Sequence, residues 1–138
     1  MKEYNEFHDG WFEGLWIEGE TAYVFLATHE HERFVFCADG VAELTVDGVK
    51  SSNIIFEVLV RDPDEVVLQD LKTLYPLRGD SAAEAQAANL FEKVRLQKWR
   101  IQEINPSYGA GCLILASSFD LLRCEDWLKQ FERNDLPA

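Results

Sequence analysis

The chain lacks most of the features that assign a protein to a class at first sight. Its three cysteines form no Cys-x-x-Cys pair, and their odd number leaves at least one thiol unpaired, as in a reducing compartment. No apolar run approaches the ~18 residues of a membrane-spanning helix. The acidic N-terminus has no apolar stretch of the secretory-signal type. We therefore expect a soluble, cytoplasmic protein without a membrane partner.

Sequence motifs of catalysis are also missing. No GxxxxGK(S/T), GxSxG or HExxH sequence occurs, so three common signatures of enzyme active sites are excluded. The GxG at Gly109-Ala-Gly111 has no helical pattern after it, and a turn explains it better than phosphate binding does. We expect no cofactor, and a non-enzymatic protein is a stronger expectation than an enzyme.

Lysine and arginine are absent between residues 3 and 32, where eight acids stand among seven aromatic residues. Residues 1–70 carry 16 Asp and Glu against 4 Lys and Arg, and residues 71–138 carry 9 against 9. The first half therefore holds the whole formal net charge of −12. An acidic, aromatic-rich segment attracts basic partners and repels nucleic acid and anionic membranes. We expect a basic protein partner and no nucleic acid.

The length and composition predict one globular domain over residues 1–138, with 47% hydrophobic and 28% charged residues. The first sixty residues predict an antiparallel meander of about five strands, over residues 14–18, 21–28, 33–38, 41–46 and 53–61. Asp39-Gly40 and Asp47-Gly48 are typical of hairpin turns between such strands. Residues 22–27 are apolar on both alternating faces, which predicts a central strand that is covered on two sides.

Helical patterns begin at Asp62, which is a suitable N-cap before Pro63 and two acids. Apolar spacing then predicts a helix up to Pro76, with a strand over residues 66–68 as the alternative. An alanine-rich pattern predicts a second helix over residues 82–95.

The C-terminal segments predict two strands and a last helix. The strands lie over residues 99–104 and 111–117, around a loop at residues 105–109. Residues 119–124 either extend the second strand or pair beside it, and residues 125–133 form a short packed helix. The fold class is α+β, an antiparallel β-meander curled or sandwiched with one or two helices packed on a face.

The sharpest chemical candidate is His29-Glu30-His31. In a strand the two imidazoles would share one face ~7 Å apart, which suits one divalent metal if further ligands converge, and His8 is the only other histidine. An exposed hairpin end explains the same residues without a ligand. His8-Asp9 could act as an oriented general base, or simply begin a strand. A metal-dependent or small-molecule enzyme or binder built around His8, His29 and His31 therefore remains the alternative function.

The favoured partner surface is an acidic face of the N-terminal sheet. Its residues are Glu13, Glu18, Glu20, Glu30 and Glu32, which we expect at turns and on outward strand faces. Charged edges also prevent unwanted strand pairing and promote solubility, so these functions compete with partner binding as an explanation. A third alternative is a ligand-binding barrel in which Trp11, Trp16 and Phe25 line a cavity.

Short segments near both ends carry a family resemblance. They are Phe7-His-Asp-Gly-Trp-Phe-Glu-Gly14, Val41-Ala-Glu-Leu44, Ile104-Asn-Pro-Ser-Tyr-Gly-Ala110 and Leu113-Ile-Leu-Ala116. Their order resembles small uncharacterised bacterial β-rich domains, some of which look like immunity proteins of toxin systems. The resemblance implies a small protein that works by binding, such as neutralising a basic toxin, and it supplies no catalytic residues. It leaves the oligomeric state open.

Overall fold

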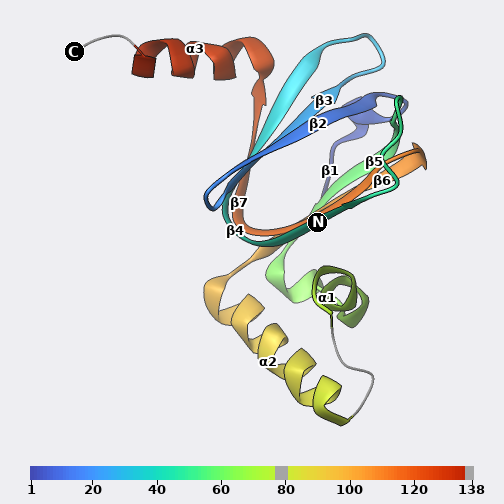
Figure 1. The fold of residues 1–138 in the computed structure, drawn as a ribbon, viewed down its shortest axis with the longest axis vertical. Coiled ribbons are helices and arrows are strands. Elements are labelled where there is room, and N and C mark those ends of the chain that lie inside the picture. Colours follow the sequence, from blue (N-terminus) through green and yellow to red (C-terminus); the bar gives the residue numbers. More distant parts are fainter. Residues whose placement is uncertain (77–80, 136–138) are drawn as a thin grey trace.

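The computed structural model describes residues 1–76 and 81–135 (Figure 1). Along the chain the elements are β1 (Lys2–Glu3), η1 (Asn5–Phe7), β2 (Trp11–Glu18), β3 (Thr21–Ala27), β4 (Arg33–Asp47), β5 (Ile54–Arg61), η2 (Pro63–Glu65), α1 (Leu68–Leu74), α2 (Ser81–Gln97), β6 (Arg100–Tyr108), β7 (Gly111–Arg123) and α3 (Cys124–Asp135). None of the helices in this part of the chain is long and apolar enough to cross a membrane.

All strand pairs are antiparallel, and the sheet closes on itself. The strand order is β1-β5-β2-β3-β4-β7-β6, and β5 pairs in addition with β6. The closure is extensive between β5 and β6 but rests on a single pair, Trp11 with Ile54, between β5 and β2. The α+β class is confirmed, and the meander is curled.

The inner face of the closed sheet forms the main core. Ala22 and Leu26 on β3 point inward and are fully buried. The alternate residues Tyr23 and Phe25 point outward, where each ring lies 5.3 Å from the Trp127 ring of α3. The prediction of a central strand covered on two sides is therefore confirmed for β3.

A second core lies outside the sheet, under α1 and α2. Its buried members are Val66, Leu71, Leu74, Val94, Ile101, Leu113 and Leu115. In Figure 1 these two helices lie on one side of the sheet and α3 lies at the other end. The helices thus cover two separate outer surfaces.

Asp39-Gly40 does not form the predicted hairpin turn, because β4 passes through it without a break. Gly40 has φ +63°, and the register with β7 shifts between Val41 and Glu43. These features mark a β-bulge, which bends a strand without ending it. A Cβ at Gly40 would overlap the Ser117 hydroxyl of the paired strand, so only glycine fits.

Two other boundaries differ from the sequence prediction. Asp62 precedes the short helix η2, and α1 begins separately at Leu68, so the single predicted helix is two. The predicted loop at residues 105–109 belongs mostly to β6. Residues 119–123 extend β7, as the first of the two predicted alternatives has it. The helices predicted over residues 82–95 and 125–133 are present as α2 and α3.

Arg61 joins three elements below the sheet. Its guanidinium donates two hydrogen bonds to the Asp70 carboxylate of α1, at 2.8 and 2.7 Å, and lies 3.2 Å from Glu103 of β6. The side chains of Arg61 and Asp70 are only 13% and 10% exposed. Asp70 also accepts the Val67 backbone N–H, which fixes the start of α1.

Candidate functional site

One edge of β2 is free along most of its length. The strand pairs with β3 from Trp11 to Glu18, but its other edge meets β5 only at Trp11 and, through a hydrogen bond from the Phe12 N–H, the Asn53 carbonyl just before β5. The free part of the edge therefore runs from Glu13 to Glu18. In the described part of the chain no further strand pairs with this edge. A free edge presents unpaired backbone groups that can accept another strand.

The turn after β2 determines which backbone groups face this edge. Glu18 and Thr21 pair across a two-residue turn whose first residue, Gly19, has φ +60°, as in a type II′ hairpin. The pair that flanks such a turn is hydrogen-bonded, and hydrogen-bonded pairs alternate along an antiparallel ladder. Leu15 and Ile17 therefore direct their backbone N–H and C=O groups toward the free edge.

A groove of about 520 Å³ runs beside the free edge. Trp11, Leu15 and their neighbours in β2 form one wall, and Val46 of β4 together with residues 49–53 of the connection to β5 form the other. Leu15 and Val46 pack against the core inside the closed sheet, so the groove opens where the ring of strands is incomplete. Its volume lies within the ~300–1,000 Å³ that is usual for binding sites.

Asn53 holds the second wall in place. Its side-chain oxygen accepts the backbone N–H groups of Lys50 and Ala110, at 2.8 and 2.9 Å, and its amide donates to the Lys50 carbonyl. The residue is 8% exposed, and it connects this wall to the turn before β7. The groove is therefore preformed.

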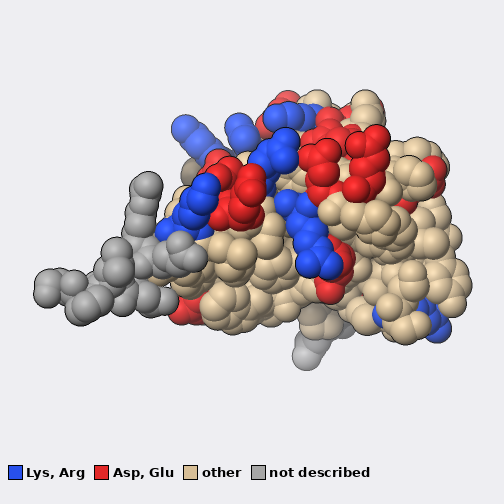
Figure 2. Space-filling view, turned by 90° about the horizontal axis from the view of Figure 1, so that it is seen from above, with Lys and Arg blue, Asp and Glu red and all other residues tan. Residues whose placement is uncertain are grey.

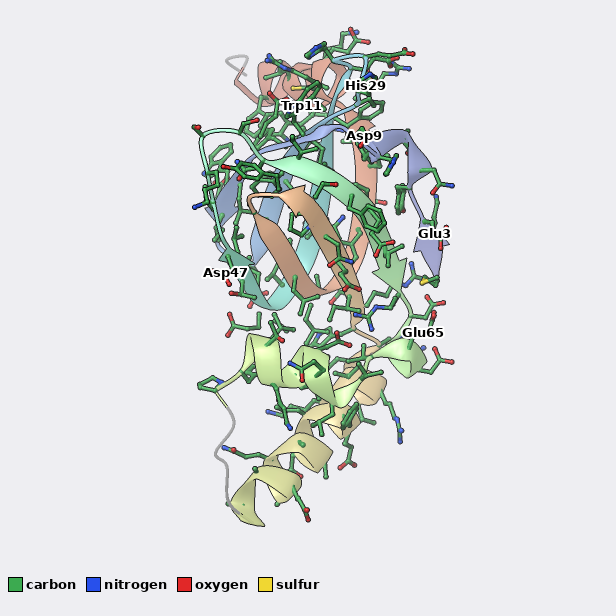
Figure 3. All side chains as sticks on the ribbon, turned by 90° about the vertical axis from the view of Figure 1, so that its right-hand side faces the viewer. Glu3, Asp9, Trp11, His29, Asp47 and Glu65 are labelled. Atoms are coloured by element: carbon green, nitrogen blue, oxygen red, sulfur yellow. The ribbon has the colours of Figure 1, made fainter. Side chains whose placement is uncertain are left out.

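His29 and His31 lie in the turn between β3 and β4, as the hairpin interpretation predicts. His31 has φ +67°, and the turn is closed by backbone bonds between Thr28 and both His31 and Glu32. Both imidazoles lie nearly parallel to the Trp11 indole, with ring centroids 4.6 Å away for His31 and 6.4 Å for His29. Figure 3 shows Trp11 and His29 together at this end of the sheet.

His8 is held apart from this pair. Its Nδ1 lies 2.8 Å from the Phe56 carbonyl oxygen, and its Nε2 lies 3.6 Å from Asp9. Within the described residues, only Asp62, Asp64 and Glu65 bring three potential metal-ligand atoms within 4.8 Å of one another. The Met1 amino group lies 2.8 Å from Glu65 and 3.7 Å from Asp62. The structure therefore does not assemble the three histidines into one metal site.

The five glutamates divide between the two ends of β3. Glu18 and Glu20 lie at the turn before this strand, whereas Glu30 and Glu32 lie at the turn after it. The seven residues of β3 separate the two groups by roughly 20 Å. Glu13 is the extra residue of a bulge in β2, beside the groove.

Two of these glutamates form ion pairs. Glu13 lies 3.4 Å from Arg33, and Glu32 lies 3.2 Å from Arg123. For Glu18, Glu20 and Glu30, the described residues supply no ion-pair partner. Figure 2 accordingly shows acidic and basic side chains interspersed at the α3 end of the molecule.

The aromatic residues of the sheet do not line a common cavity. Trp11 borders the groove, but Trp16 and Phe25 pack on the outer face against Trp127, at centroid distances of 6.2 and 5.3 Å. On the same outer face, burial and then the nearby acids raise the pKa of the Cys37 thiol to about 11. That thiol is protonated at neutral pH, and a protonated thiol is a poor nucleophile.

Comparison of the chain with models of protein families, with curated proteins and with solved structures finds no match. The site is therefore interpreted from its own geometry. Sequence reasoning found the turn at Gly19 and the acids around it, but it missed the free edge and the groove. Both depend on where β5 stops pairing with β2, and no local pattern in the sequence indicates that point.

Proposed function

We propose that this protein is a non-enzymatic module that binds a basic protein through the acidic N-terminal part of its sheet. The observation that carries the proposal is the free edge of β2, which Glu13, Glu18 and Glu20 border. Glu30 and Glu32 lie farther away and would contribute by longer-range attraction. Such attraction increases the rate of encounter with an oppositely charged partner.

The chemistry of the other candidate groups supports binding rather than catalysis. His8 is oriented by a backbone carbonyl, and the other two histidines stack on Trp11. The alternative of a metal-dependent or small-molecule enzyme has no comparable support, because His8 lies apart from His29 and His31.

The resemblance to immunity-type domains suggests a specific form of this function, in which the basic partner is a bacterial toxin. Cys37, Cys112 and Cys124 are all unpaired thiols, which agrees with action in a reducing cytoplasm. Solubility and protection of the β2 edge are the competing explanations for the same acids.

Capture from native lysate followed by mass spectrometry tests the proposal. Wild type is compared with the double variant Glu18→Lys/Glu20→Lys and with Glu84→Lys/Glu92→Lys on the exposed surface of α2, which makes the same change in net charge. We expect a basic protein that wild type and the α2 control retain, and that the hairpin variant loses.

Raising salt from ~0.1 M to ~1 M shortens the screening length from ~10 Å to ~3 Å and should release that partner. Binding that is indifferent to salt would overturn the proposal, and so would equal loss in both double variants. If the acids serve only solubility and edge protection, the hairpin variant instead self-associates and wild type captures no basic protein.

A further inference from the structure

We propose that the partner binds as an extended segment, which adds a strand to the free edge of β2 and lies in the groove between β2 and residues 46–53. The inference rests on the proposed function and specifies its mode of recognition. Strand addition is a common way for a sheet to bind a peptide, because the backbone supplies affinity while alternate side chains supply specificity.

The backbone of β2 is prepared for such a strand. Leu15 and Ile17 direct their N–H and C=O groups to the free edge, as the alternation from the Glu18–Thr21 pair requires. Their side chains lie on the inner face of the sheet, because these residues pair with Val24 and Ala22 of the interior core. An added strand would continue that face across the gap in the ring.

The groove determines the alternation expected in the bound segment. Val49, Leu15 and Val46 are apolar residues that line the groove, and Val49 is 63% exposed. Ile17 lies beyond the groove on the same edge of β2 and is 54% exposed. Apolar side chains of the added strand would cover these residues. The intervening side chains would point outward, where Glu18, for which the described residues supply no ion-pair partner, favours lysine or arginine.

Charge also argues against a second copy of this chain as the occupant. An antiparallel pair of β2 strands would bring Glu13 and Glu18 of the two copies together at both ends of the new ladder. Like charges placed opposite each other in a sheet are destabilising. A segment that alternates apolar and basic residues has the complementary pattern.

The test uses a fluorescent peptide of alternating valine and lysine residues, with the same peptide N-methylated on alternate residues as its control. Binding is measured by fluorescence anisotropy, and amide exchange is followed by NMR. We expect the peptide to protect the amides of Leu15 and Ile17. The amides of Trp16 and Glu18, which face β3, should change little. N-methylation on the docking edge should abolish binding.

Two substitutions at one position separate backbone from side-chain recognition. Ile17→Pro removes a backbone N–H that faces the free edge of β2, and proline is tolerated on the free side of an edge strand. Ile17→Ala keeps that N–H and removes only the side chain. We expect Ile17→Pro to weaken binding at least ~10-fold, and Ile17→Ala by clearly less. Circular dichroism verifies that both variants fold.

The outcomes distinguish strand addition, as the mode of recognition, from the proposed function of binding a basic protein. Binding that Glu18→Lys/Glu20→Lys and high salt abolish, but that Ile17→Pro and N-methylation leave unchanged, overturns strand addition and leaves the proposed function standing. Binding that N-methylation abolishes, but that neither the charge substitutions nor salt weakens, overturns the proposed function. Absence of peptide binding at millimolar concentration overturns strand addition, as does a new β2–β2 dimer in its place.

Discussion

Gln102 should reduce the stability of this fold. It lies on β6 and pairs with Val60 of β5 and Ile114 of β7, so its side chain shares the inner face of the closed sheet with theirs. The residue is 0% exposed, and neither its Oε1 nor its Nε2 has a hydrogen-bond partner. A buried amide in an apolar core has lost its hydration without replacement.

The expected gain from removing this amide follows from the cost of burying it. Mutational data place that cost at about 1–3 kcal/mol for an amide without a compensating hydrogen bond. Methionine is close to glutamine in length and volume, so Gln102→Met preserves the packing. We expect the free energy of unfolding to rise by about 1–3 kcal/mol and Tm by roughly 4 °C per kcal/mol.

Urea denaturation followed by circular dichroism measures the change, with Gln97→Met on the exposed surface of α2 as the matched control. The control should change the free energy of unfolding by no more than ~0.5 kcal/mol. If Gln102→Met instead destabilises the protein by ~1 kcal/mol or more, the reasoning is refuted. Such a result would mean that the amide is satisfied in solution, for example by a buried water.

Two substitutions and one labelling experiment test other parts of the fold. Asp70→Ala removes the bidentate carboxylate of the buried Arg61 guanidinium and leaves Glu103 as its remaining acidic neighbour, so urea denaturation should show a loss of about 1.5–3 kcal/mol. Gly10→Ala places a Cβ against the Ala27 carbonyl where β2 meets β5, so it should lower Tm and expose the interior to a hydrophobic dye. Burial raises the pKa of the Cys112 thiol to about 12, so at pH 8 iodoacetamide should label it only after unfolding. Rapid labelling of this thiol in the folded protein would contradict its burial.

Local sequence patterns correctly predicted the strands and helices whose conformation depends mainly on their own residues. β3 alternates two apolar faces, and the structure covers both. The spacing of apolar residues in α3 predicted a packed helix, which now places Trp127 over Tyr23 and Phe25. Such patterns succeed because side-chain direction follows directly from strand and helix periodicity.

Asp39-Gly40 shows where local reasoning fails. A glycine with positive φ serves equally in a hairpin turn and in a bulge, and the dipeptide is the same in both. The choice depends on β7, whose register continues along β4 on both sides of Gly40. A strand about eighty positions later in the chain therefore determines the conformation at this glycine.

In the candidate site, too, some features follow from the local sequence and others only from the tertiary structure. The sequence by itself determined that the acids and aromatics of the first thirty residues alternate along short strands and gather at their turns. The predicted strand over residues 21–28 also placed Glu18 and Glu20 before it and Glu30 and Glu32 after it. Only the tertiary structure decided that Glu13 and Glu32 pair with arginines. It also decided that β2 meets β5 through one residue pair, Trp11 with Ile54, and the adjacent hydrogen bond from Phe12 to Asn53, which leaves the β2 edge from Glu13 to Glu18 free beside a groove. The physical reason is that composition and periodicity act between neighbours in the chain, whereas a free edge exists only where distant strands stop pairing.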